Sequence, residues 1–88
     1  MHKPFIVKLK PPAPPVAIKI RTAFIRLDAF LKRCNAVESG GQAKLEIQTG
    51  HVRVNSEVCT QRGKKLRAGD TVRFAGTTYL ADASADEN

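Results

Sequence analysis

Lysines and arginines dominate the ionisable side chains of this 88-residue chain, and the chemistry they offer is the binding of anions. The chain has 15 Lys and Arg against 8 Asp and Glu, so its net charge is +7. Three of the acids lie in the last seven residues, which leaves residues 1–81 with a net charge of +10. An excess of this size indicates a polyanionic partner, either nucleic acid or an anionic membrane surface.

Two cysteines and two histidines offer a second kind of chemistry. Cys34 and Cys59 form no C-x-x-C motif, and His2 and His51 lie at spacings unsuited to zinc. Cys34 and His51 could form a nucleophile–base pair, but Cys34 continues an apolar helical stripe and no third group orients the pair. We therefore predict two reduced thiols, no catalytic residue, no metal and no cofactor, in a chain too short for a separate substrate domain.

The first elements along the chain are predicted to be a strand and a helix. Residues 16–20 alternate between large apolar and other side chains, which is typical of a strand. Residues 27–34 place apolar side chains at the i, i+3, i+4, i+7 spacing of an amphipathic helix, and Asn35 should end it. Arg26 and Arg33 are seven residues apart, so we expect them to share a flank of this helix.

A second helix is predicted to begin at a capping box. Ser39 should accept a hydrogen bond from the amide of Gln42, and Gln42 should reach back to the amide of Ser39. Gly40 and Gly41 weaken helix propensity by about 1 kcal/mol each. Their expected use is a close backbone approach, either to the first helix or to a ligand phosphate. A short apolar face follows, and Gly50 is a suitable terminator.

Strand patterns fill the rest of the chain. Residues 52–55 alternate and lead through a tight turn into residues 57–60. Residues 61–65 form a basic loop, and further strands are predicted at 71–74 and 78–80. The order of these elements predicts an α+β fold, with two short packed helices followed by a small, mainly antiparallel twisted β-sheet.

Composition divides the chain into three parts. Residues 1–15 hold all five prolines and read as a basic, proline-rich flexible leader, in which Lys8–Pro14 matches a K-x-x-P-x-x-P ligand pattern. Residues 16–81 should form the folded domain, and residues 82–88 an acidic disordered tail. No apolar run approaches the ~20 residues that span a bilayer, and no signal peptide is evident. We therefore expect a cytoplasmic protein with no membrane contact.

Several short motifs occur in an order that resembles one family, the S4 RNA-binding domain. The family signature runs R-L-D, then S-(R/G)-x-x-A-(R/K), then G-x-V-x-V-N, then G-D. The corresponding segments here are Arg26–Asp28, Ser39–Lys44, Gly50–Asn55 and Gly69–Asp70. The S-G-G form of the second motif and the segment Arg62–Leu66 resemble the small stand-alone bacterial members.

The resemblance implies an αL motif, an L-shaped pair of helices that presents a basic face to structured RNA. Matching positions place Arg26, Lys44 and Arg53 on this face, and Asn55 could donate to a phosphate or a ribose 2′-hydroxyl. The complete set of candidate RNA-binding residues is Arg26, Arg33, Gly40, Gly41, Gln42, Lys44, Arg53, Asn55, Arg62, Lys64 and Lys65.

Some of these assignments rest on charge alone or depart from the family pattern. The basic residues of loop 62–65 are included for their charge, as a mobile lip beside the face. Asp28 and Asp70 should cap or brace the fold, because an exposed acid there would repel RNA. Gly40 stands where many members have Arg, which removes one expected phosphate contact. Ser56 stands where many have Gly, which alters the turn more than the chemistry.

The mode of recognition follows from the scarcity of aromatic residues. Phe30 and Phe74 are expected in the core, so little is left for base stacking, and we predict recognition of RNA shape and backbone. The expected partner of a monomeric protein is structured RNA, either ribosomal or tRNA-like, with a ribosomal subunit as a candidate. The alternative is a protein–protein interaction module that uses its sheet edge or proline-rich leader on a ribosome-associated factor. The short, poorly basic helices disfavour a membrane binder.

Overall fold

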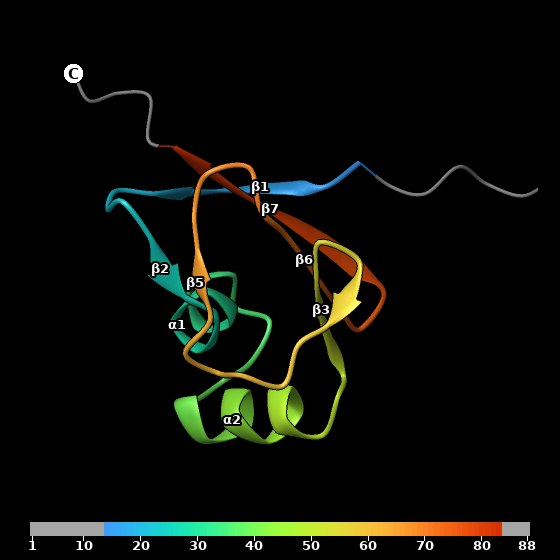
Figure 1. The fold of residues 1–88 in the computed structure, drawn as a ribbon. Helices are drawn as coiled ribbons and strands as arrows, with labels where there is room; N and C mark the ends of the chain where they lie inside the picture. Colours follow the sequence, from blue (N-terminus) through green and yellow to red (C-terminus); the bar gives the residue numbers. More distant parts are fainter. Residues whose placement is uncertain (1–13, 84–88) are drawn as a thin grey trace, which may run out of the picture.

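The structure, a computed structural model, describes residues 14–83 (Figure 1). Two short helices pack side by side, and most of the strands follow them along the chain. The α+β fold predicted from the sequence is confirmed. The elements in chain order are β1 (Val16–Ile20), β2 (Ile25–Arg26), α1 (Leu27–Arg33), α2 (Gly40–Gln48), β3 (Val52–Val54), β4 (Glu57–Val58), β5 (Lys65–Leu66), β6 (Thr71–Phe74) and β7 (Thr77–Ala83).

The strands form a five-stranded sheet and a separate two-stranded one. The larger sheet has the order β1-β7-β6-β3-β4, and β2 pairs with β5 in the smaller sheet. β1 runs parallel to β7, whereas the other pairs are antiparallel, so the prediction of a mainly antiparallel sheet is confirmed. The first and last strands of the described chain thus lie side by side (Figure 1).

The last strand is longer than the sequence indicated. β7 extends to Ala83, so Asp82 and Ala83 belong to the sheet and not to the predicted acidic tail. The physical reason is the pairing with β1, which places Lys19 opposite Asp82 with an ion pair of 3.6 Å between Nζ and Oδ2. Residues 84–88 of the predicted tail, and the predicted leader up to residue 13, lie outside the described residues.

One hydrophobic core joins the helices to the sheets. The α1 stripe contributes Leu27, Phe30 and Leu31, all fully buried, as its periodicity predicted. Cys34 packs at the edge of the same cluster and is half-buried. The other members come from both sheets, from α2 and from the loop before it: Ile20, Val37, Ala43, Ile47, Val52, Val54, Leu66, Val72 and Ala81.

The helix ends follow the predicted signals with one difference. Asn35 has a φ of 59°, the left-handed conformation that follows a helix end. At the start of α2, Ser39 Oγ accepts from the amide of Gln42 at 3.1 Å, as expected. The Gln42 side chain, however, accepts from the amide of Glu38 at 2.8 Å and not from that of Ser39. The second bond of the capping box is therefore made to the amide of Glu38, one residue before Ser39.

A tight turn joins β3 to β4 and is fixed by a side-chain network. Asn55 and Ser56 have φ values of 52° and 75°, and Val54 pairs with Glu57. A two-residue turn with both φ values positive matches the twist of a hairpin. Asn55 Oδ1 accepts from the amide of Thr71 at 3.0 Å, and its Nδ2 donates to Asp70 Oδ1 at 3.1 Å. The hairpin is thereby bonded to the start of β6.

Asp70 is the acceptor on which this network converges. Its second carboxylate oxygen accepts from the amide of Arg67 at 2.8 Å. That backbone hydrogen bond, helped by the amide of Asn55 and by nearby Lys64 and Arg67, lowers the pKa of the Asp70 carboxyl below its ordinary value of 3.8. Asp70 thus braces the fold, as the sequence predicted.

The lowered pKa makes the contribution of Asp70 depend on pH. A carboxyl with a depressed folded pKa stabilises the native state above its unfolded value, and this stabilisation is lost as the pH falls through the folded pKa. Asp70→Asn should therefore be less stable than wild type near neutral pH, by up to about 1 kcal/mol because solvent screens the site. The difference should shrink below about pH 4, as measured by urea denaturation at several pH values. A difference that does not change with pH would contradict the assignment, and Glu57→Gln at an exposed position is the charge-matched control.

Candidate nucleic-acid interface

The N-terminus of α1 is docked onto the basic loop that precedes β5. The amide of Leu27 donates to the carbonyl of Lys64 at 2.8 Å, and the amide of Asp28 donates to that of Arg62 at 3.1 Å. These bonds satisfy donors that a helix start leaves without partners inside the helix. The loop is therefore bonded to the helix at two points, and the prediction of a mobile lip is wrong at these residues.

This docking gathers basic side chains around the start of α1. Arg26 lies opposite Lys65 in the β2–β5 pair, and Arg62 and Lys64 supply the two carbonyls. All four residues are exposed, and we refer to Arg26, Arg62, Lys64 and Lys65 as the α1 cluster. One acid enters it, because Arg26 Nη2 lies 3.2 Å from Asp28 Oδ2. The surface of the α1 cluster therefore has a net positive charge, and backbone hydrogen bonds between the loop and α1 hold its basic residues together.

Phe24 adds an aromatic ring beside this cluster. Its side chain is 39% exposed, and the Lys65 ammonium lies 4.8 Å from the centre of the ring. A cation at this distance is attracted by the face of the ring. Sequence reasoning missed Phe24 because it stands in a short segment with no periodic pattern.

The second helix places its predicted residues in different settings. Lys44 is exposed on α2, next to buried Ala43. A Cβ at Gly40 would meet nothing within 4 Å, and one at Gly41 only Ser39 Oγ at 3.8 Å. The predicted close approach of these glycines to α1 is therefore wrong, whereas their use toward a ligand stays a prediction. The Gln42 side chain is engaged in capping.

Two other predicted residues serve the fold. Arg33 Nε donates to the carbonyl of Lys19 at 2.7 Å, which ties the end of α1 to β1. The side chain of Arg26 instead lies beside Gly63, where a Cβ would be 3.8 Å from Arg26 Nη2. The two arginines therefore extend toward different elements and do not share a flank of α1. Asn55 uses its side chain in the network with Asp70 and is first of all a structural residue. These two contacts were not predictable from local sequence patterns, because each joins residues at least 14 positions apart.

Arg53 lies on the outer face of the large sheet, where the structure adds a residue that the sequence reasoning missed. Buried Val52 and Val54 point into the core, so Arg53 between them points outward. Its Nη1 donates to the carbonyl of Ser56 at 3.3 Å. Arg73 of β6 lies directly opposite Arg53. The alternation in Thr71–Phe74 would have placed Arg73 outward, but the pairing of β3 with β6 was not predicted.

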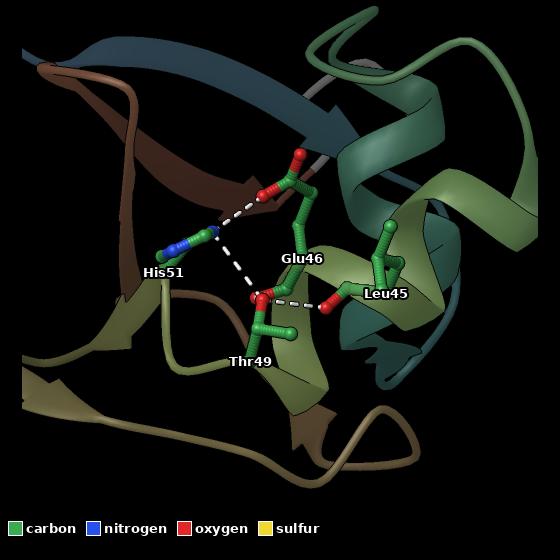
Figure 2. Close-up of polar contacts among 4 residues, drawn as sticks. All are labelled: Leu45, Glu46, Thr49 and His51. Atoms are coloured by element: carbon green, nitrogen blue, oxygen red, sulfur yellow. Dashed lines mark hydrogen bonds and ion pairs between the residues drawn. The ribbon is translucent and has the colours of Figure 1, made fainter.

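His51 is held at the end of α2 and is not paired with Cys34. Figure 2 shows its ring facing Glu46 and Thr49, with Nδ1 2.7 Å from Glu46 Oε1 and 3.3 Å from Thr49 Oγ1. Thr49 Oγ1 also donates to the carbonyl of Leu45 at 2.7 Å. The polar contacts of His51 thus close the helix end, and the nucleophile–base pair considered from the sequence finds no support.

Comparisons with known proteins define the class to which this fold and surface belong. The family model of the S4 domain matches residues 18–81. The chain therefore belongs to the S4 domain family, as the ordered motifs indicated.

Two relatives and one solved structure agree with this assignment. The chain is 42% identical over 59 residues to the probable ribosome maturation protein RlbA of Bacillus subtilis (strain 168), a match covering 67% of this chain and 83% of that protein. It is 51% identical over 52 residues to the putative RNA-binding protein YbcJ of Escherichia coli (strain K12), covering 59% and 74% respectively. The solution structure of E. coli YbcJ, described as revealing an αL motif involved in RNA binding, superposes with a TM-score of 0.63 at 31% identity, over 88% of this chain and 99% of that one. This likeness confirms the fold.

The described residues offer neither a metal site nor a membrane-spanning helix. Among residues 14–83, no three His, Cys, Asp or Glu side chains lie together as a set of metal ligands. No helix within these residues is long and apolar enough to cross a membrane.

The setting of Cys34 predicts an unreactive thiol. Burial raises its pKa to about 12, although the charge of Arg33 acts in the opposite direction. In a Cys59→Ser variant, iodoacetamide should therefore label Cys34 at least about tenfold more slowly than in the same variant unfolded in urea, because the thiolate is the reacting form. The labelling rate should keep rising as the pH is raised toward 12. A rate that levels off near pH 9 would show an ordinary thiol and contradict the assignment.

Proposed function

We propose that this protein is a non-catalytic, cytoplasmic RNA-binding protein that recognises structured RNA, ribosomal or tRNA-like, through its shape and phosphate backbone. The observation that carries the proposal is the α1 cluster, in which four exposed bases are held by backbone hydrogen bonds between loop and helix. Lys44 on α2, exposed on the neighbouring helix, is the further candidate contact.

A fixed set of cations suits a phosphate backbone for two reasons. Each base that neutralises a phosphate releases condensed counterions, which favours binding in a salt-dependent way. A base on a preorganised backbone also loses less conformational entropy on binding than one on a mobile loop. The bonds from Leu27 to Lys64 and from Asp28 to Arg62 provide this preorganisation.

The aromatic residues support recognition of the backbone over stacking on many bases. Phe30 is fully buried, and Phe74 and Tyr79 pack against the core. Phe24 is therefore the one exposed large aromatic residue among residues 14–83. RNA-binding sheets that read single strands display two or three aromatic rings, so the surface favours structured RNA.

The names of the relatives indicate which RNA to test first. One is called a probable ribosome maturation protein and another a putative RNA-binding protein. Ribosomal RNA is thus the first candidate ligand, and transfer RNA is the second because both are compact and double-helical over much of their length.

A protein-interaction module is the second candidate function. Leu45 is 60% exposed on α2, and Val58 is 51% exposed on the edge strand β4. An exposed edge strand is a template for pairing with another chain. A defined ribosome-associated protein that binds the purified chain in the presence of RNase, and no longer binds Leu45→Ser or Val58→Asp, would favour this function.

The RNA-binding proposal predicts a specific loss when charge is removed from the α1 cluster. In Lys64→Gln/Lys65→Gln, the affinity for purified ribosomal RNA or tRNA should fall roughly 15- to 30-fold at ~0.15 M salt, with the salt slope smaller by about 1.4–1.8, because two phosphate contacts are lost. Filter binding at several salt concentrations measures both quantities.

The matched control removes two positive charges elsewhere. Arg21→Gln/Lys32→Gln changes exposed residues outside the α1 cluster and should lower affinity by less than about threefold with little change of slope. Equal losses in the two double variants would mean that only net charge matters. Wild-type affinity independent of salt would contradict the proposal itself.

A further inference from the structure

The outer face of the large sheet carries a second group of cations, separate from the α1 cluster. Arg53, Ser56, Thr71, Arg73 and Thr78 line a shallow hollow of about 460 Å³. We refer to these residues as the outer-sheet patch. They belong to β3, β6, β7 and the turn after β3, whereas Arg26 and Lys65 of the α1 cluster lie on the small β2–β5 sheet.

The two arginines of this patch lie opposite each other in the pairing of β3 with β6. Arg53 and Arg73 are directly opposite in the β3–β6 pair, and Val58 and Thr78 continue the row on either side. Like charges directly opposite each other in a sheet are destabilising. Within residues 14–83, neither arginine has an ion-pair partner. The juxtaposition of Arg53 and Arg73 therefore adds repulsion to the fold, whereas an anion bound by both guanidinium groups would offset it.

The hydrogen-bonding groups of the patch fit an anion with several oxygens. Each guanidinium has five N–H donors and no acceptor. Arg53 Nη1 donates to the carbonyl of Ser56 at 3.3 Å, and the other nitrogens of this guanidinium have no hydrogen-bond partner among residues 14–83. The hydroxyl of Thr71 donates its one proton to Asn55 Oδ1 at 3.4 Å, whereas Thr78 lines the same hollow and also carries a hydroxyl. Two neighbouring arginines with the hydroxyl of Thr78 match the charge and the oxygens of a phosphate group.

We propose that the outer-sheet patch binds a phosphate of the RNA backbone, as a second contact surface in addition to the α1 cluster. This inference rests on the proposed function and adds to it a requirement on the ligand. Val52, Val54 and Val72 place the other face of the sheet in the core with the helices, so the patch points away from α1 and α2. The ligand class is therefore an RNA folded so that two backbone segments reach two surfaces of the protein, and not a single strand in one groove.

The first test uses one arginine that the fold does not need. Arg73→Gln should lower affinity for purified ribosomal RNA or tRNA about fivefold at ~0.15 M salt and reduce the salt slope by about 0.7–0.9, because one phosphate contact is lost. Arg73→Lys keeps the charge and should keep the slope. Arg21→Gln is the matched control, since Arg21 is exposed and outside both surfaces. Circular dichroism checks that each variant is folded.

The second test measures binding of a phosphate compound to the patch in the absence of RNA. Inorganic pyrophosphate, compared with chloride at equal ionic strength, should raise the Tm of wild type more than that of Arg73→Gln, because a ligand of the native state stabilises it. Arg73→Gln should also have the higher Tm in low salt without pyrophosphate, because the repulsion with Arg53 is gone.

The outcomes separate this inference from the proposed function. If Arg73→Gln binds RNA with unchanged affinity and slope while Lys64→Gln/Lys65→Gln is impaired, the inference is overturned and the proposed function stands. If wild type binds no RNA, both fail as statements about RNA, and a pyrophosphate effect confined to wild type would assign the patch to a different phosphate source. Equal pyrophosphate effects in wild type and Arg73→Gln would overturn the phosphate site.

Discussion

The docking of the basic loop onto the first turn of α1 is the contact on which the rest of the interface depends. Two backbone hydrogen bonds, each worth about 1 kcal/mol, join Leu27 and Asp28 to the carbonyls of Lys64 and Arg62. They continue into the β2–β5 pair, where Leu66 is buried with Leu27 in the common core. Because the apolar side of this unit is fixed in the core, its charged side can only face solvent. The same bonds that complete the helix therefore also hold the α1 cluster in place.

A second constraint acts at the hairpin between β3 and β4. Asn55 joins the turn to Asp70 and to the start of β6. These bonds help to set the register between β3 and β6. That register brings Arg53 opposite Arg73 on the outer face. The family motif V-N thus serves the fold directly, through the turn and its network, and contributes to the proposed binding only through the arginines whose positions it determines. Ser56 keeps this turn with a φ of 75°, where glycine would be less strained.

Local features of the sequence predicted much of the fold, and contacts between distant residues account for what they did not predict. The apolar stripe of α1, the Ser39 cap and the strand Thr71–Phe74 were predictable, because each depends on residues within one element. The parallel pairing of β1 with β7, the anchoring of Arg33 and the opposition of Arg73 to Arg53 were not, because they depend on how distant segments meet. For loop 62–65, charge alone predicts a role in RNA binding. Its backbone hydrogen bonds to α1, which hold the basic residues in one place, were not predictable from the sequence.

Binding of RNA at the α1 cluster can be measured directly by mapping backbone amide chemical shifts as purified tRNA or a ribosomal RNA fragment is added to the labelled protein. We expect the largest changes on Arg26, on Lys44 and on residues 62–65, and we expect them to reverse as salt is raised, because the contacts are to phosphates. Changes confined to the apolar surface around Leu45 and Val58, or changes that persist in high salt, would contradict this expectation.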